Sequence, residues 1–104
     1  MSLLSTLGFG NEKIKEALRR GAVIIDIRTA AEFDRGKVHG SINIPLDRIN
    51  INLKRILQMN RPIIICSDSD SENERVIDVL KANGVKEIYN GGSWVKLWRM
   101  VRSL

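Results

Sequence analysis

One stretch of the chain decides the fold: Arg61-Pro-Ile-Ile-Ile-Cys-Ser-Asp-Ser-Asp-Ser-Glu-Asn-Glu-Arg75. Its apolar beginning is typical of a strand that is buried on both faces of a parallel sheet. Its acidic second half leads into a helix, and Ser71-x-x-Glu74 has the pattern of a capping box. The only cysteine of the chain, Cys66, stands where the strand ends. Open α/β sheets place their ligand sites beyond the carboxyl ends of the strands, so we expect the functional site here.

The length and composition indicate a single domain spanning residues 1–104, of which 1–10 are expected to form a flexible N-terminal segment. With 43% hydrophobic and 28% charged residues, the composition is ordinary for a globular protein. One cysteine cannot form an internal disulfide, which favours a reducing, cytoplasmic location. The sequence has no apolar run of about 18 residues, so no membrane span is expected. Its start lacks the basic region of a signal peptide.

The charges are unevenly distributed along the chain. The net charge is +5, yet residues 67–74 hold four acidic side chains and no basic one. The basic residues elsewhere are scattered rather than gathered with aromatic residues on one helix, which argues against a nucleic-acid partner. They favour solubility or an anionic substrate. The single histidine and the single cysteine lie far apart, so neither a metal site nor a cofactor is predicted.

Apolar runs and helical periods alternate along the chain. Thr29-Ala-Ala-Glu32 is a capping box, and Asn11 and Ser93 are candidate N-caps. Asn90-Gly-Gly92 predicts a turn. The expected strands span 22–27, 41–44, 62–66 and 86–89, and the expected helices span 11–20, 30–36, 46–57, 71–82 and 94–101. This alternation predicts an α/β fold with a parallel sheet and right-handed crossovers.

Several segments together match one family pattern. The first half contains Ile24-Ile-Asp-Ile-Arg28, Glu32-Phe33 and Gly36-Lys-Val-His-Gly-Ser-Ile-Asn-Ile-Pro45. The second half contains Ile63-Ile-Ile-Cys66, Leu80-Lys-Ala-Asn-Gly84 and Tyr89-Asn-Gly-Gly92 followed by a tryptophan. These segments resemble the rhodanese family, over about residues 11 to 98. The resemblance implies the rhodanese-like three-layer fold, in which helices flank a central parallel sheet.

The resemblance also implies an activity. Enzymes of the family use a cysteine to take the outer sulfur of thiosulfate or a similar small anionic donor, and the persulfide then passes the sulfur to a thiol acceptor. The thiolate is the nucleophile, and loop amides at a helix start lower its pKa and hold the donor. Cys66 is the candidate catalytic residue, with Asp26 and Arg28 as supporting residues. The substrate-binding loop would consist of Ser67, Asp68, Ser69, Asp70, Ser71 and Glu72.

Two registers compete for the position of the family's cysteine. One places it on Cys66 and makes the loop one residue longer. The other counts back from Leu80 and Gly84 at the usual family spacing and places it on Ser67. We favour the second register because it needs no insertion. In either register the loop lacks the glycine and the arginine that family loops usually carry.

The acidic loop leaves two main functional hypotheses, which differ in whether the chain is catalytically active. A carboxylate about 4 Å from a thiolate costs ~1–4 kcal/mol, so the acids at 68, 70 and 72 should raise the cysteine pKa and repel anionic donors. The first hypothesis is a sulfurtransferase that uses thiosulfate or a persulfide. The alternative is a catalytically inactive rhodanese-fold module that binds a partner or a small cation. A phosphatase-like activity ranks third, because the phosphate-binding arginine is missing.

The acidic residues also have a structural explanation, since carboxylates stabilise the positive end of a following helix. The spacing Asp68-x-Asp70-x-Glu72 further imitates the start of a calcium loop. Asn73 and Val79 stand where such a loop needs glycine and glutamate, so no calcium site is expected.

Two further predictions concern packing. Arg28 is expected to pair with Asp26 or Glu32 and to brace the end of its strand. Trp94 and Trp98 are expected to pack against the core rather than to form a partner-binding stripe. No oligomeric state is predicted.

Overall fold

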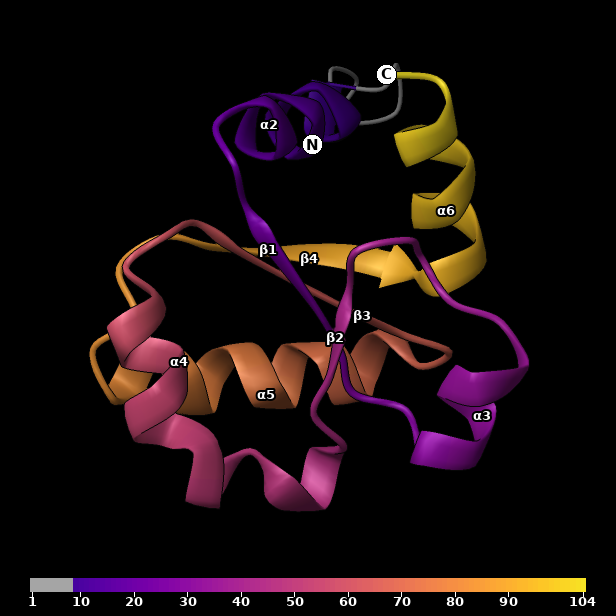
Figure 1. Cartoon of the computed structure of the whole chain (residues 1–104). Helices are drawn as coiled ribbons and strands as arrows, with labels where there is room; N and C mark the ends of the chain where they lie inside the picture. Colours follow the sequence, from indigo (N-terminus) through magenta and orange to yellow (C-terminus); the bar gives the residue numbers. More distant parts are fainter. Residues whose placement is uncertain (1–8) are drawn as a thin grey trace.

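The structure is a computed structural model and describes residues 9–104 (Figure 1). In this range four strands alternate with helices, as the sequence predicts. The strands are β1 (Val23–Asp26), β2 (Ile42–Asn43), β3 (Ile63–Ser67) and β4 (Ile88–Ser93). The helices are α2 (Phe9–Arg19), α3 (Ala30–Arg35), the 3-10 turns η1 (Leu46–Arg48) and η2 (Asn50–Asn52), α4 (Leu53–Met59), α5 (Asp70–Ala82) and α6 (Trp94–Arg102). The N-terminal segment predicted to be flexible lies almost entirely outside the described residues.

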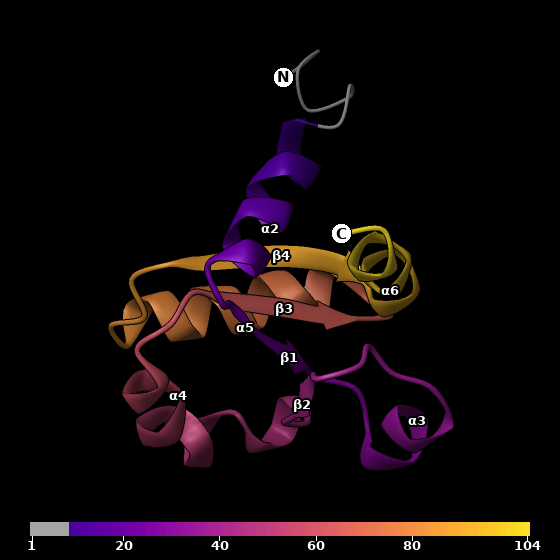
Figure 2. The ribbon, with the colours of Figure 1, turned by 45° about the horizontal axis from the view of Figure 1, so that its top comes forward.

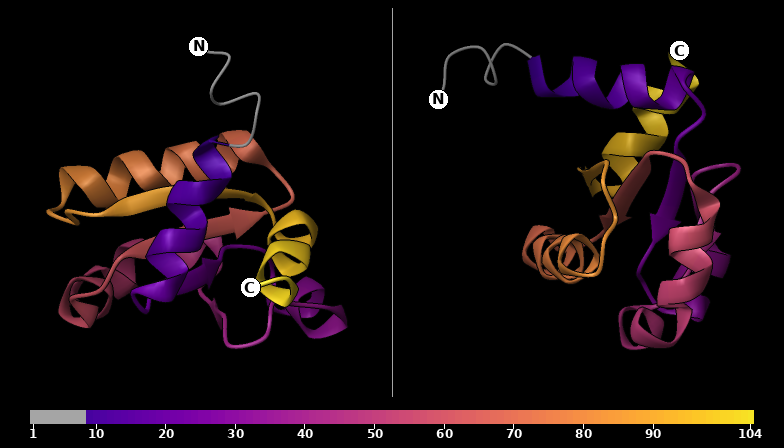
Figure 3. Two further views of the ribbon diagram at one scale, coloured as in Figure 1. Left: turned by 90° about the horizontal axis from the view of Figure 1, so that it is seen from above. Right: turned by 90° about the vertical axis from the view of Figure 1, so that its left-hand side faces the viewer.

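The four strands form one parallel sheet in the order β2-β1-β3-β4. α2 and α6 cover one face of the sheet, and α4 and α5 cover the other (Figures 1 and 3). α3 lies beside the sheet, beyond the end of β1 (Figure 2). This arrangement confirms the predicted α/β fold with a central parallel sheet between helical layers. Among the helices of residues 9–104, none reaches the length and hydropathy of a transmembrane segment.

Side chains that alternate along the strands divide the core into two clusters. One cluster lies between the sheet and α4 and α5, and it contains Ile63 and Ile65. The other lies between the sheet and α2 and α6, and it contains Ile64 and Cys66. Every residue of β3 is buried, as expected for an apolar strand inside a parallel sheet. Because Cys66 and Ser67 are consecutive, they face opposite helical layers.

Local capping explains where α3 and α6 begin. Thr29 Oγ1 accepts a hydrogen bond from the Glu32 N–H at 3.2 Å, and the Glu32 carboxylate accepts one from the Thr29 N–H at 3.0 Å. This reciprocal pair confirms the predicted capping box. Ser93 caps α6, as predicted, by accepting from the N–H three residues later.

Two other helix starts differ from the predictions. α5 begins earlier, because Ser69 rather than Ser71 accepts the hydrogen bond from a first-turn N–H, at 3.2 Å. Both serines have an acid three residues later, so the pattern alone did not distinguish them. α2 begins at Phe9, so Asn11 lies inside the helix and is not its N-cap.

The helix predicted over residues 46–57 is broken into η1, η2 and α4. Asn52 leaves the helical region at φ −103°, ψ 6° and donates a side-chain hydrogen bond to the Arg48 carbonyl at 2.8 Å. Asparagine side chains compete with the backbone for such bonds, and this competition interrupts a helix whose apolar spacing is otherwise regular.

β4 has one more residue than β3 near its end. Ile65 pairs with Asn90, but Ser67 pairs with Ser93, so β4 bulges between these positions. Gly91 lies in the bulge, where an added Cβ would come within 2.8 Å of a side chain of β3. The turn predicted over 90–92 is therefore wrong, because these residues lie inside β4, where Gly91 packs closely against β3 and Gly92 adopts a positive φ of 73°.

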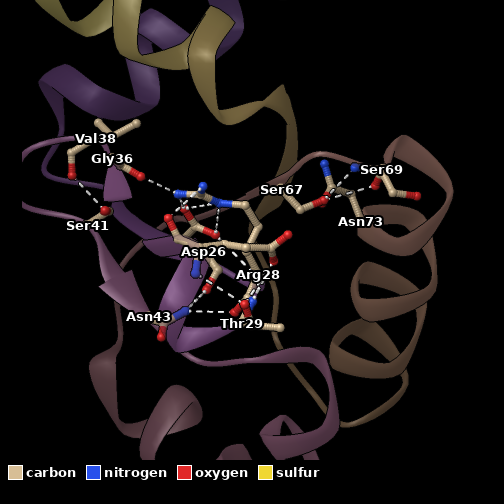
Figure 4. Close-up of polar contacts among 11 residues, drawn as sticks. Asp26, Arg28, Thr29, Gly36, Val38, Ser41, Asn43, Ser67, Ser69 and Asn73 are labelled. Atoms are coloured by element: carbon tan, nitrogen blue, oxygen red, sulfur yellow. Dashed lines mark hydrogen bonds and ion pairs between the residues drawn. The ribbon is translucent and has the colours of Figure 1, made fainter. Parts of the chain in front are cut away.

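A buried asparagine joins α5 to the ends of β3 and β4. Asn73 is fully buried, and its Oδ1 accepts a hydrogen bond from Ser67 Oγ at 2.7 Å (Figure 4). Its Nδ2 donates to Asn90 Oδ1 at 3.0 Å and to the Gly92 carbonyl at 3.1 Å. The bulge of β4 brings both acceptors within reach of one amide group. The amide thus fixes three elements at the edge where the strands end.

A charged cluster ties the end of α2 to β4. The Arg20 guanidinium donates to both carboxylate oxygens of Glu87, and the Tyr89 hydroxyl donates to Glu87 at 2.6 Å. The hydrogen bonds from Arg20, and next those from Tyr89, lower the pKa of Glu87 to about 2. Glu87 therefore stays ionised far below the pH at which a free glutamate is protonated.

Replacing Glu87 with glutamine should remove an acid-sensitive part of the stability. The folded pKa is about 2 and the ordinary value is 4.5, so the contribution is complete above about pH 5 and is lost as the pH falls towards 2. Urea unfolding over this range should show wild type and Glu87→Gln converging as the pH decreases. A stability difference that stays constant from neutral to acidic pH would contradict this assignment.

Asn73→Ala should destabilise the protein by about 2–4 kcal/mol, because it leaves the buried groups at the ends of β3 and β4 without hydrogen-bond partners. Urea unfolding at neutral pH measures this loss. Asn50→Ala, at an exposed asparagine of η2, is the matched control and should change the unfolding free energy by less than about 0.5 kcal/mol. Equal effects of the two substitutions would rule out the bracing role of Asn73.

Candidate functional site

A buried ion pair lies where β1 ends. Asp26 is fully buried and Arg28 is 7% exposed. Arg28 Nη2 donates to Asp26 Oδ2 at 2.7 Å, and Nε donates to Oδ1 at 3.0 Å (Figure 4). Burial by itself would lower the pKa of Arg28, but the hydrogen bonds and the charge of Asp26 raise it above the ordinary value. The predicted bracing pair is confirmed, with Asp26 rather than the Glu32 carboxylate as the partner.

The other N–H groups of Arg28 hold α3 and the loop that follows it. Nη1 donates to the Glu32 carbonyl at 3.2 Å, and Nη2 donates to the Gly36 carbonyl at 2.7 Å. The Trp94 ring of α6 covers the guanidinium, with 4.3 Å from Cζ to the ring centroid. Gly36 makes this contact possible, since a Cβ would lie 2.9 Å from the ring. Arg28 is therefore a structural brace and not a free cation for an incoming anion.

A cleft of about 520 Å³ opens beside this pair, between β1, the start of η1 and the start of α5. Its charged lining is predominantly acidic. The charged residues that line it are Arg28, Glu32, Asp47, Asp68 and Glu72. Because Arg28 is already neutralised by Asp26, the four carboxylates dominate the field in the cleft and disfavour anionic ligands. A smaller pocket of about 300 Å³ lies at the opposite end of the strands, where β3 and β4 begin. None of the predicted site residues lines it.

Cys66 does not reach the cleft. Its side chain is fully buried in the apolar cluster beneath α2 and α6. Burial, and then the nearby charge of Asp26, raises the pKa of the Cys66 thiol well above its ordinary value. The thiol is therefore protonated at neutral pH and lacks the nucleophilic form that sulfur transfer requires.

Ser67 occupies the last position of β3 and is only 1% exposed. Its hydroxyl donates to Asn73 Oδ1 at 2.7 Å and accepts from the Ser69 N–H at 2.9 Å. An amide oxygen is too weak a base to activate a hydroxyl, so this arrangement orders the strand end rather than preparing a nucleophile. Neither of the two candidate nucleophiles lines the cleft.

The stretch predicted as a substrate-binding loop is mostly helical. Only Asp68 and Ser69 lie between β3 and α5, and residues 70–72 form the first turn of α5. The predicted stretch therefore consists of a two-residue loop followed by the first turn of a helix. The helix start also places Asp70 and Glu72 in a helical turn, whereas the second and third positions of a calcium loop are not helical. Within residues 9–104, no three side chains of metal-ligating type are grouped as a metal site.

The acids of this stretch divide between two sides of α5. Asp68 and Glu72 line the cleft. Asp70 and Glu74 accept hydrogen bonds from Asn90 Nδ2, at 3.0 and 2.6 Å. Two of the four acids are thus bound to β4, and only the other two are available to a ligand in the cleft.

Two residues that shape this region had no assigned role in the sequence: Asp47 and Asn73. Trp94 was expected to pack against the core, which is confirmed for Trp94 and Trp98, but its contact with Arg28 was not predicted. Asn73 did carry a signal. It stands at helical spacing before the apolar residues of α5, and a polar residue on a buried stripe needs a partner. Asp47 and the contact of Trp94 with Arg28 gave no comparable signal, because each residue is brought to the site from a distant element by the tertiary fold.

Comparison with known proteins places this geometry in a family. The rhodanese-like domain model matches residues 11–98, which is most of the chain. The uncharacterized protein YqhL of Bacillus subtilis (strain 168) is 32% identical over 79 residues, covering 76% of this chain and 62% of that protein. The chain thus spans about three-fifths of the length of this curated relative.

Solved structures share the architecture. SSP1007 from Staphylococcus saprophyticus subsp. saprophyticus is 25% identical with a TM-score of 0.68, and the match covers 83% of this chain and 87% of that one. A rhodanese with anions from E. coli is 19% identical with a TM-score of 0.66, covering 73% and 91%. At that identity the E. coli structure supports the fold alone. The family model and the shared fold agree: this chain belongs to the rhodanese-like domain family.

Proposed function

We propose that this chain is a non-catalytic member of its family, a rhodanese-fold module that binds a partner and does not take sulfur from thiosulfate. One observation carries the proposal: the only cysteine, Cys66, is sealed inside the apolar cluster under α2 and α6. The residue beside it at the strand end, Ser67, cannot form a persulfide. The unpaired thiol suits a reducing, cytoplasmic setting.

The electrostatics of the cleft support the same conclusion. Thiosulfate carries two negative charges, and Asp68 and Glu72 line the cleft that a donor would enter. Each carboxylate about 4 Å from a unit negative charge costs ~1 kcal/mol in water and ~4 kcal/mol near a protein surface. Arg28 does not offset this repulsion, because Asp26 already holds its guanidinium. The same field attracts cationic groups, so the partner we propose presents lysine or arginine side chains to the cleft.

Sulfur transfer through Cys66 is the second candidate, and membership of the family favours it. It requires the end of β3 to open so that the thiol meets solvent and ionises. The two candidates therefore differ in whether the sulfur of Cys66 is accessible in the native protein.

Incubation of the native protein with excess thiosulfate should leave its intact mass unchanged. Iodoacetamide should modify Cys66 slowly in the native protein and rapidly after unfolding in urea, because burial keeps the thiol protonated and out of reach. Intact-mass spectrometry follows both reactions. A mass gain of one sulfur atom that is absent in Cys66→Ala would refute the non-catalytic proposal.

Restoring the family's Cys-x-x-Gly-x-Arg pattern from position 67 should create activity if the family's nucleophile belongs at that position. The variant Ser67→Cys/Asp70→Gly/Glu72→Arg, in a Cys66→Ala background, loses two carboxylates and gains a cation, so thiosulfate should convert its new thiol to a persulfide. Mass spectrometry detects the product, and circular dichroism checks the fold. The same variant with Ser67 retained is the matched control and should stay unmodified. A folded variant that gains no sulfur would count against placing the family's nucleophile at position 67.

A further inference from the structure

Two segments far apart in sequence carry only positive charge. They are residues 35–45, which run from the end of α3 through β2, and residues 94–102, which form α6. Neither segment contains an aspartate or a glutamate. Their basic residues are all exposed, and we call them together the basic face: Arg35, Lys37, Lys96, Arg99 and Arg102.

Packing brings the two segments together. The Trp94 ring of α6 lies directly over Gly36. Val38 is fully buried in the same apolar cluster as Leu97 and Met100 of α6. α6 and the segment after α3 accordingly both lie on the right-hand side of the molecule in Figures 1 and 2. The two basic segments are therefore neighbours in the folded protein.

The basic residues of α6 point away from the core. Leu97 and Met100 are buried, and at roughly 100° per residue the three cations cover about a third of the helix circumference on the outer side. In the described part of the chain, none of Lys96, Arg99 and Arg102 forms an ion pair with a carboxylate. Their charge is available to an external anion.

Half-buried aromatic rings accompany these cations, and α6 carries three basic residues and two tryptophans. The basic residues are therefore less scattered than was expected from the sequence. Lys37 lies 4.9 Å from the Phe33 ring centroid, and Arg102 lies 4.6 Å from that of Trp98. Aromatic rings beside Lys and Arg are typical of the headgroup level of a bilayer.

We propose that the basic face is a docking surface for an anionic lipid bilayer. The apolar side of α6 packs against its own sheet, so the contact is made by charge at headgroup level and not by helix insertion. The acids of residues 68–74 belong to the loop before α5 and to its first turns, and α5 covers the face of the sheet opposite to α6. This inference is independent of the chemistry of Cys66.

Co-sedimentation with vesicles of phosphatidylcholine and phosphatidylglycerol tests the proposal. Wild type should bind these vesicles, should not bind pure phosphatidylcholine, and should be released by salt. Lys96→Glu/Arg99→Glu should lower the partition coefficient by roughly tenfold or more. The matched control is Lys54→Glu/Arg55→Glu, which makes the same charge change at exposed positions of α4 on the other face of the sheet. It should stay within about twofold of wild type.

Three results would overturn the proposal. The first is no binding of wild type to the mixed vesicles at low salt. The second is an equal loss in both variants, which would assign binding to net charge rather than to this face. The third is displacement from vesicles by double-stranded DNA at equal phosphate concentration, which would identify a nucleic-acid surface instead. Circular dichroism of both variants ensures that lost binding is not lost folding.

Discussion

The alternation of side chains along β3 is the constraint on which the site depends. Because successive residues face opposite sides of a sheet, Cys66 and Ser67 cannot both face the same helical layer. The register with β1 and β4 sends Cys66 towards α2 and α6 and Ser67 towards α5. A slip of one residue would exchange them and place a hydroxyl in an apolar cluster, so the packing of both faces maintains the register. The alternation along β3 therefore decides which of these two side chains faces which helical layer, and so which chemical groups are available at the end of the strand.

The ion pair of Asp26 and Arg28 adds a second constraint. Its guanidinium holds a buried carboxylate, two backbone carbonyls and the face of Trp94 at once. Removing one partner of such a pair leaves an uncompensated charge in the interior, which is why a cation engaged in this way is not released to a ligand. The cleft beside it therefore takes its character from the acids around it. The cleft at the carboxyl ends of the strands is thus lined mainly by negative charge.

Much of this fold could be predicted from the sequence, and the failures have specific causes. Apolar runs located β1, β2 and β3, and the box formed by Thr29 and Glu32 located α3, because both signals are local. The strand predicted over 86–89 shares only residues 88 and 89 with β4, because the bulge that extends β4 through the glycines has no local signal. The break of the helix at Asn52 could not be predicted, because it depends on the Asn52 side chain, rather than a backbone N–H, donating the hydrogen bond to the Arg48 carbonyl. The bracing partner of Arg28 was among those expected. To predict that Cys66 is buried, one must know which face of the sheet it points to and which helices cover that face. The alternation along the strand supplies the first, but only the tertiary structure supplies the second.

The bulge of β4 has a consequence for how this domain tolerates changes of length. The extra residue keeps Asn90 on the side of α5 while Gly91 lies against β3. Deleting either glycine would make the ladder regular, yet it would shift every later position of β4 by one and rotate the start of α6 relative to the sheet. Trp94 would then leave Arg28 uncovered. The extra residue therefore sets the orientation of α6 relative to β4 in this chain.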